Sequence, residues 1–233
     1  MRNPLWILIC LIPAFVVLGC DSSSDDGGGG DGGGTIEIIG TSGSAVEMDG
    51  TWLRAGGCIS EEGSDESESN QLEFDGDGFT ATFDTYLTVE DCSGTPEFVT
   101  GVEGSVTSDQ MVTITGWVDG TGDESTAPEG LEDVTDANGV TVTLLSATMT
   151  PSTAEIADGL NSEELCGYTD WEAGVGQDVL DCLLEDSDNP AKVTWVVDDS
   201  GDTLFLYESP DDSDELDADG YPTVIETNDP LEM

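Results

Sequence analysis

The chain has 233 residues, of which 52 are Asp or Glu, three are Lys or Arg and none is His, so its formal net charge is −49 at pH 7. Binding to nucleic acid or to an anionic membrane surface is disfavoured, because there is no basic patch to contact phosphates. The missing histidine excludes a Ser-His-Asp catalytic triad. Acidic charges at this density repel one another unless salt screens them, so the composition predicts adaptation to marine or hypersaline surroundings.

Residues 1–19 form the first predicted element, a secretory signal. Arg2 is followed by an apolar stretch over 5–18, which is shorter than the roughly 20 residues of a membrane-spanning helix. The signal ends at Val17-Leu18-Gly19-Cys20, which resembles the lipobox of bacterial lipoproteins, where cleavage precedes a cysteine that takes acyl chains. The lipobox usually has Leu where this chain has Val17. The alternatives are a signal anchor and an ordinary signal followed by a chance cysteine.

Residues 20–34 are predicted to be a lipidated Cys20 and a flexible tether. The run 21–34 consists of Asp, Ser and Gly, and a Gly-rich chain without apolar side chains stays a flexible coil. Acyl chains such as palmitate on Cys20 would hold the protein on a lipid bilayer. We therefore expect a lipid-anchored protein of the cell envelope; the outer membrane is favoured over the inner, and the sequence leaves that choice open. Residues 35–233 are expected to form a single domain.

Most segments of this domain alternate apolar and polar side chains, which is the pattern of half-buried β-strands. The sequence Asp75-Gly76-Asp77-Gly78 predicts a tight hairpin turn, 119–135 a polar loop, and 152–165 a weak helix. The pattern predicts an all-β fold, an antiparallel meander that forms a barrel or sandwich with at most one short helix. The expected strands are 35–40, 45–55, 71–74, 79–83, 86–92, 97–107, 110–120, 139–150 and a hairpin over 192–209.

The cysteines of the domain form an even set once Cys10 leaves with the signal and Cys20 takes lipid. Four cysteines in an exported protein suggest two disulfides, because the compartment is oxidising. A zinc site is the alternative, but the chain has no histidine and no CxxC spacing. Three pairings exist, and we favour the one in which each pair lies within one supersecondary unit: Cys58–Cys92 and Cys166–Cys182.

The segment Gly50-Thr51-Trp52 resembles the GxW element that opens lipocalin-type barrels, in which the tryptophan closes one end. With "LEFDGDGFTATFDTYLTVEDC", "CGYTDWEAGVGQDVLDC" and the "TLFLYES…GYPTVIE" ending, residues 48–227 resemble poorly characterised bacterial lipoproteins with a lipocalin-like β domain. The chain departs from them in its acidity and in Tyr221, where a basic residue is expected. The resemblance implies a lipocalin-like barrel and an envelope address, and it implies no particular ligand.

The acidic stretch "ELDADGYPTVIE" is the sharpest candidate for a metal site. Glu215, Asp217, Asp219 and Glu226 stand at positions 1, 3, 5 and 12 of an EF-hand-like loop, with Gly220 at position 6. Alternate residues can turn oxygen atoms inward, and the last Glu can bind calcium with both oxygens. The alternative is a solvated acidic turn that enters the last strand.

Four tryptophans could line a ligand cavity: Trp171 and the three leading candidates Trp52, Trp117 and Trp195. Core packing is the alternative for all four. Asp75 and Asp77 are interpreted as turn formers rather than metal ligands.

Function is predicted only by class. A pair of carboxylates could hydrolyse a glycoside, but nothing in the spacing singles out two of 52 acids, so no enzyme is expected. No cofactor is required, and calcium is the candidate ion. We expect a binding or structural module for a small apolar ligand or an envelope partner, with a calcium-stabilised surface or adhesion protein as the alternative.

Overall fold

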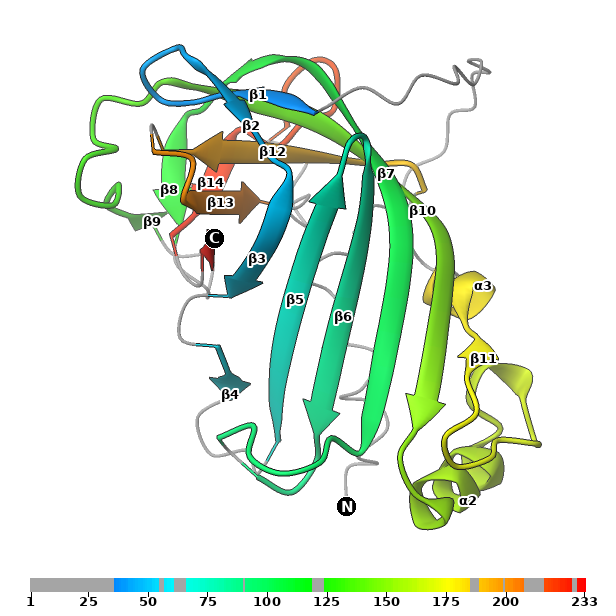
Figure 1. Ribbon diagram of the computed structural model, residues 1–233. Helices are drawn as coiled ribbons and strands as arrows, with labels where there is room; N and C mark the ends of the chain where they lie inside the picture. Colours follow the sequence, from blue (N-terminus) through cyan, green and yellow to red (C-terminus); the bar gives the residue numbers. More distant parts are fainter. Residues whose placement is uncertain are drawn as a thin grey trace.

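Eight antiparallel strands close into a barrel in the computed structural model (Figure 1), which confirms the predicted all-β class. The structure describes residues 36–54, 57–60, 66–89, 91–118, 124–184, 189–198, 200–207, 216–227 and 230–233. Around the barrel the order is β3 (Gly50–Arg54), β5 (Ser67–Asp75), β6 (Gly78–Tyr86), β7 (Phe98–Thr113), β10 (Asp136–Pro151), β12 (Ala191–Val197), β13 (Thr203–Tyr207) and β15 (Leu231–Glu232). Strand β15 pairs with β3 and completes the ring.

Shorter elements surround this ring. The signal, Cys10, Cys20 and the tether lie outside the described residues. No helix among the residues that are described is long and apolar enough to cross a membrane. The shorter elements are β1 (Glu37–Ile39), β2 (Ala45–Glu47), β4 (Ile59–Ser60), β8 (Gly116–Val118), β9 (Glu124–Ser125), β11 (Gln177–Asp178), β14 (Val224–Glu226), α2 (Ala154–Glu163), α3 (Leu180–Leu183) and a 3₁₀ turn (Leu165–Gly167).

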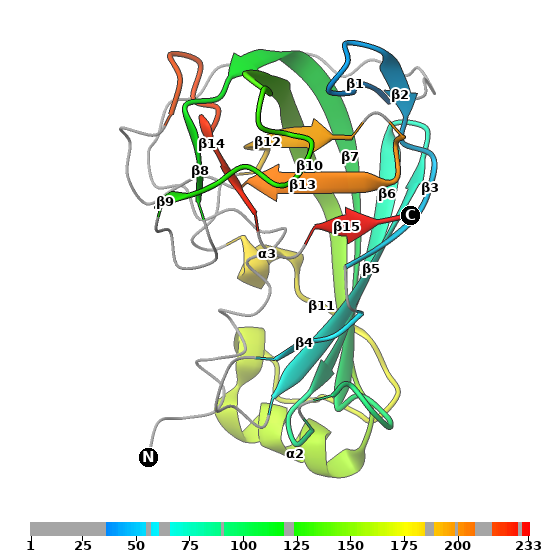
Figure 2. The ribbon, with the colours of Figure 1, turned by 90° about the vertical axis from the view of Figure 1, so that its left-hand side faces the viewer.

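The barrel has two unlike ends, which Figures 1 and 2 show in two views. The β1–β2 hairpin lies at one end, where β12, β13 and β15 complete the wall. Strands β5, β6, β7 and β10 continue to the other end, where α2 lies. Two short strands flank these four, because β4 pairs with β5 and β11 pairs with β10. We call the two ends the hairpin end and the α2 end.

The turn at 75–78 and the helix near 152–165 form as predicted. Asp75 pairs with Gly78 across the turn between β5 and β6, and Gly76 has the positive φ of 66° that this turn requires. Helix α2 begins after Thr153, whose hydroxyl accepts a hydrogen bond from the amide of Ile156. The structure adds the four-residue helix α3.

Two expected strand boundaries differ in the structure. The expected strand 86–92 is a loop after the first residue, because β6 ends at Tyr86. Strand β7 runs over 98–113, so it joins the expected strand 97–107 to the first part of the expected strand 110–120. Gly139 of β10 pairs with Gln110 and Val140 pairs with Ser108, so Asp109 is an extra residue in a β-bulge. The bulge accommodates the extra polar residue, so the strand continues through the point where the alternation of apolar and polar residues is interrupted.

The hairpin end of the barrel is filled by large apolar side chains. Trp52 and Trp195 are almost completely buried there with Ile38 and Met48, and the Trp52 Nε1 donates a hydrogen bond to the carbonyl of Met48 at 3.1 Å. The rings of Phe74 and Trp195 meet edge to face at 5.7 Å between centroids. Interiors packed in this way supply most of the stability of a small barrel.

A second apolar cluster lies outside the barrel wall. Phe205 and Val196 point away from the interior cluster and are buried with Ile225 of β14. Trp117 of β8 packs on this cluster, with its ring 6.2 Å from that of Phe205. The small sheet of β14, β8 and β9 therefore covers the outer face of β12 and β13.

Both predicted disulfides are present. Cys58 and Cys92 are bonded with their Cα atoms 5.8 Å apart, and Cys166 and Cys182 with theirs 5.3 Å apart. The first links the chain before β4 to the loop after β6, and the second closes the segment between α2 and α3.

Asn138 holds the β1–β2 hairpin to the barrel, and its removal is expected to destabilise the fold. Its side-chain amide accepts from the amide of Ile39 at 2.8 Å and donates to the carbonyls of Ile39 and Trp195. Asn138→Ala should lower the free energy of unfolding by about 2–3 kcal/mol, because it leaves buried backbone groups unpaired. Urea denaturation measures the change.

Asn189 provides a matched control. It makes the same two-bond contact with the backbone of Leu144 but is exposed, so water can replace it. Asn189→Ala should lower the free energy of unfolding by less than about 1 kcal/mol. Equal costs for the two variants would contradict the role given to Asn138.

Candidate functional site

Strand β5 carries polar side chains on its inner face at the α2 end of the barrel. The residues of β5 that face the interior are Glu68, Asn70, Leu72 and Phe74, and all four are buried. Their outward neighbours Gln71 and Glu73 are exposed. The apolar half of this row belongs to the filled core, whereas Glu68 and Asn70, with exposed fractions of 3% and 7%, bring a carboxyl and an amide inside.

Two threonines extend this polar group across the neighbouring strands. Thr85 of β6 pairs with Glu68. Asn70 pairs with Phe83 of β6, and Phe83 pairs in turn with Thr100 of β7. Both threonines are buried. We call Glu68, Asn70, Thr85 and Thr100 the inner polar cluster. It lies in a wall that is otherwise apolar, since Phe83, Phe98 and Met149 are buried beside it.

Arg54 comes to the same face from β3. Trp52 faces the interior two residues earlier, so the alternation of the strand brings Arg54 to the inner side as well. The Arg54 guanidinium interacts with the carboxyl of Glu68. Burial nevertheless raises the pKa of Glu68 from 4.5 to about 7, and Arg54 offsets only part of that rise.

Asn70 is the most informative member of the inner polar cluster. Both its Nδ2 and its Oδ1 are buried and have no hydrogen-bond partner among the described residues. A buried polar group without a partner costs about 1–3 kcal/mol, and such groups are rare in folded proteins. The indole Nε1 of Trp171 in the same apolar core is likewise buried without a partner. This end of the barrel thus holds hydrogen-bonding capacity that the protein leaves unused.

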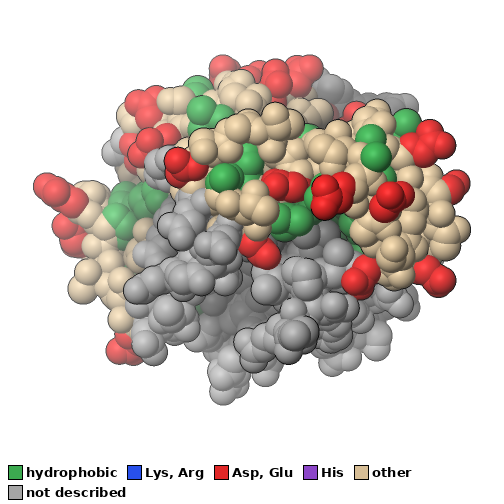
Figure 3. Space-filling model, turned by 90° about the horizontal axis from the view of Figure 1, so that it is seen from below, with side chains coloured by type: hydrophobic (Ala, Val, Ile, Leu, Met, Phe, Trp, Pro, Cys, Tyr) green, Lys and Arg blue, Asp and Glu red, His purple; other side chains and the backbone are tan. Residues whose placement is uncertain are grey.

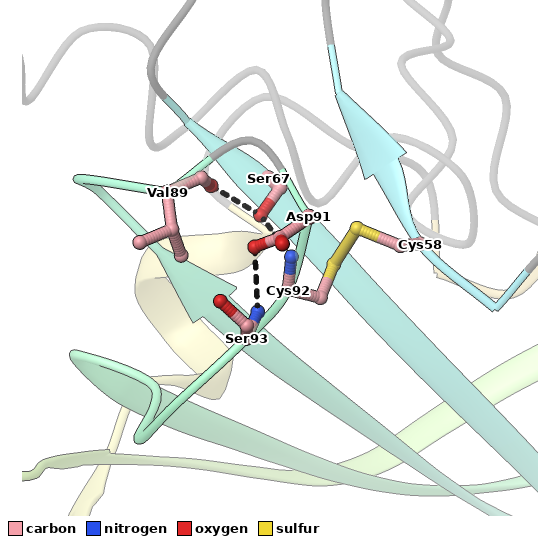
Figure 4. Close-up of a disulfide and its surroundings, with 6 residues drawn as sticks. All are labelled: Cys58, Ser67, Val89, Asp91, Cys92 and Ser93. Carbon is pink, nitrogen blue, oxygen red and sulfur yellow. Dashed lines mark hydrogen bonds between the residues drawn. A yellow bond between two sulfur atoms is a disulfide. The ribbon is translucent and has the colours of Figure 1, made fainter.

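The outer side of β5 is fixed directly behind the inner polar cluster. The Ser67 hydroxyl donates to the carbonyl of Val89 at 2.6 Å and accepts from the amide of Cys92 at 3.1 Å (Figure 4). The Cys58–Cys92 disulfide fastens the same loop. These contacts hold the start of β5 in register, so that Glu68 points inward rather than outward.

The segment after β10 supports the α2 end from the other side. Ala157 and Leu160 of α2 belong to the barrel core. Asn161 holds the backbone of Trp171 with two hydrogen bonds, at 2.6 and 3.0 Å, so the loop beyond α2 is also fixed. The surroundings of the inner polar cluster are therefore rigid and largely apolar.

The three tryptophans proposed as cavity residues do not lie together. Trp52 and Trp195 are in the interior core at the hairpin end, and Trp117 is in the outer cluster against Phe205. Core packing, the alternative given for these residues, describes their contacts. The inner polar cluster was missed because the expected strand 71–74 began too late. The alternation Glu68, Asn70, Leu72, Phe74 was the available signal, but its polar first half is typical of a loop.

The acidic stretch proposed as a calcium site folds as a hydrogen-bonded turn where it is described. The Asp217 Oδ1 accepts from the backbone amides of Asp219 and Tyr221 at 2.8 and 2.9 Å, which is an Asx turn. The Oδ2 atoms of Asp217 and Asp219 each accept a hydrogen bond from the Nε2 of Gln110, at 3.3 Å in both cases. Glu215 and the side chain of Glu226 lie outside the described residues.

Tyr221 and Lys192 fasten this turn to the barrel. The Tyr221 hydroxyl donates to the Asp109 carboxylate at 2.6 Å, and burial together with this carboxylate raises the pKa of Tyr221 to about 12. The Lys192 ammonium donates to the carbonyl of Asp219 and lies 5.0 Å from the centre of the Tyr221 ring. No group of three or more Asp, Glu, Cys or His side chains in the described part of the chain could hold a metal ion. The calcium site stays a prediction.

Acidic side chains dominate the surface around these features. Seen from below, Asp and Glu are spread across the described part of the face, and no Lys or Arg is in view there (Figure 3). The described part of this face therefore presents negative charge.

Comparison with models of known protein families gives no match for the chain, and a search of curated protein sequences gives none either. The resemblance to lipocalin-like lipoproteins therefore rests on the residues quoted above and remains a prediction.

The raised pKa of Glu68 predicts a distinctive pH dependence of stability. The folded protein keeps this proton up to about pH 7, whereas the unfolded chain loses it near 4.5, so the stabilisation by Glu68 is complete below pH 4.5 and is lost as the pH rises to 7. Glu68→Gln cannot ionise, so its free energy of unfolding relative to the unmodified protein should rise by about 2–3 kcal/mol between pH 5 and pH 8. Urea denaturation across this range measures the difference.

Glu73→Gln is the control, because Glu73 lies exposed on the outer face of the same strand. Its difference from the unmodified protein should stay constant over the same pH range. A Glu68→Gln variant that gains nothing at pH 8 would show that the carboxylate is well accommodated inside the barrel.

Proposed function

We propose that the protein is an acylated lipoprotein of the cell envelope, whose barrel binds a small, mainly apolar ligand at the α2 end. The observation that carries the proposal is the inner polar cluster: four buried polar side chains in an otherwise apolar wall, one of them with no hydrogen-bond partner. Ligand sites in proteins are apolar surfaces with a few convergent polar groups, which is the composition found here.

The address of the protein is inferred from the sequence and is consistent with the disulfides. Two disulfides are typical of proteins that fold in an oxidising compartment outside the cytoplasm. The apolar stretch, Cys20 and the Gly-rich tether supply a route to the membrane and a flexible link to the barrel. The acidic surface fits saline surroundings, where salt screens the repulsion between its carboxylates.

Ligand binding is tested with the neutral fluorescent dye N-phenyl-1-naphthylamine and full-chain protein. Thr100→Tyr places a large ring among the buried residues of the interior and should weaken dye binding about ten-fold or more. Thr82→Tyr places the same ring on the exposed outer face of β6 and should leave binding unchanged. Dye taken up by lipid or detergent is common to all samples, so the difference between the variants isolates the interior.

Near-ultraviolet circular dichroism checks that both variants are folded. If Thr100→Tyr does not fold, Thr85→Tyr replaces it, because Thr85 is also buried in the inner polar cluster. Equal dye affinities for folded inner and outer variants would contradict binding inside the barrel.

The anchor is tested by labelling cells with an alkyne analogue of palmitate. Cys20→Ala should abolish the label and release the protein from the membrane fraction, because Cys20 is the residue proposed to carry the acyl chains. Cys10→Ala, a change of the same kind within the signal, should keep both the label and the membrane location. Label that persists in Cys20→Ala would overturn the assignment of this residue.

A further inference from the structure

The side chain of Asn70 restricts the chemistry of a ligand, because it presents a hydrogen-bond donor and an acceptor side by side. Within the described part of the chain both the Nδ2 and the Oδ1 are buried without a partner, and the residue is only 7% exposed. It points to the interior between Glu68 and Leu72 of β5. A partner that satisfies both atoms must itself offer an acceptor and a donor at adjacent positions.

Apolar side chains surround this amide along the sheet. Asn70 pairs with Phe83 of β6, Phe83 pairs with Thr100 of β7, and Thr100 pairs with Met149 of β10. Phe83 and Met149 are buried members of the barrel core. A ligand that reaches Asn70 therefore places its body against apolar groups and its polar end against the amide.

Charge restricts the polar end further. The charged groups on this inner face are Arg54 and Glu68, which interact with each other. A cationic group would be repelled by Arg54, and an anionic group would be repelled by the acidic exterior, since the chain has 52 Asp and Glu. An uncharged group avoids both penalties.

We propose that the ligand of the barrel carries an uncharged amide group, whose carbonyl accepts from the Asn70 Nδ2 while its N–H donates to the Oδ1. This inference rests on the proposed function and names the chemistry of its ligand. An alcohol has a single oxygen and cannot occupy both positions in this planar arrangement. A carboxylate lacks the donor, and an ammonium group lacks the acceptor.

The experiment compares four probes with the same six-carbon chain: hexanamide, hexan-1-ol, hexanoate and hexylammonium. Binding to the full ¹⁵N-labelled chain is followed by the shift of the Asn70 side-chain amide resonances, which uptake of probe by detergent or lipid does not move. Hexanamide is expected to bind about ten-fold more tightly than each of the other three, as two added hydrogen bonds in a buried site imply.

Asn70→Leu removes both hydrogen-bonding atoms and keeps a similar size, and its binding is followed through the backbone amides of β5. The preference for hexanamide should disappear in this variant. Gln71→Leu is the matched control, because Gln71 is the next residue of β5 and lies exposed on the outer face. It should keep the preference. If Asn70→Leu does not fold, Asn70→Ala is used in the same comparison.

A second readout separates a ligand-binding role from a structural one. Without ligand, Asn70→Leu should unfold at a higher urea concentration than the unmodified protein, because it removes two unsatisfied buried groups. A lower midpoint would show that Asn70 stabilises the free protein and would overturn the inference.

The remaining outcomes are distinct. If the four probes bind with similar affinity, or if Asn70→Leu keeps the preference for hexanamide, the assignment of an amide ligand is wrong while binding inside the barrel stands. If none of the probes binds, both the amide assignment and the proposed binding function fail.

Discussion

The long antiparallel pairing of β7 with β10 is the interaction on which the rest of the structure depends. These two 16-residue strands pair from Phe98 with Pro151 at the α2 end to Thr113 with Asp136 at the other. Together with the pairing of β15 and β3, their pairing closes the sheet into a ring. Closure also assigns each alternate side chain to the inside or the outside, because a slip of one residue would exchange the two faces.

The closed ring gives its two ends different roles in stability. At the hairpin end Trp52, Trp195 and Phe74 fill the interior, and the Trp52 indole is satisfied by Met48. At the α2 end the same walls hold Glu68 and Asn70, whose burial costs free energy. The packing of the hairpin end can offset the cost of the buried polar groups at the α2 end. Proteins retain such unfavourable groups chiefly where function requires them.

Local patterns in the sequence predicted the local features of this fold. The Asp-Gly repeat of 75–78 carries the hairpin turn, and the cysteine spacing led to both disulfides. Closure of the barrel depends on strands far apart in the chain, which no local pattern reveals. The bulge at Asp109 hid the continuity of β7, and the polar start of β5 hid Glu68 and Asn70. Those two residues follow the alternation of a strand, and only its pairing with β6 shows that they face inward.

The scarcity of positive charge explains why these buried groups matter. Beyond the predicted signal the chain has only Arg54 and Lys192, and both are engaged: Arg54 interacts with Glu68, and Lys192 holds the turn at Asp219 and Tyr221. Neither contributes to a basic surface that could attract an anionic partner. The acidic exterior repels anions, and cations drawn to it find Arg54 on the inner face. For the proposed ligand, the exterior and the interior therefore favour the same class, an uncharged molecule recognised through hydrogen bonds.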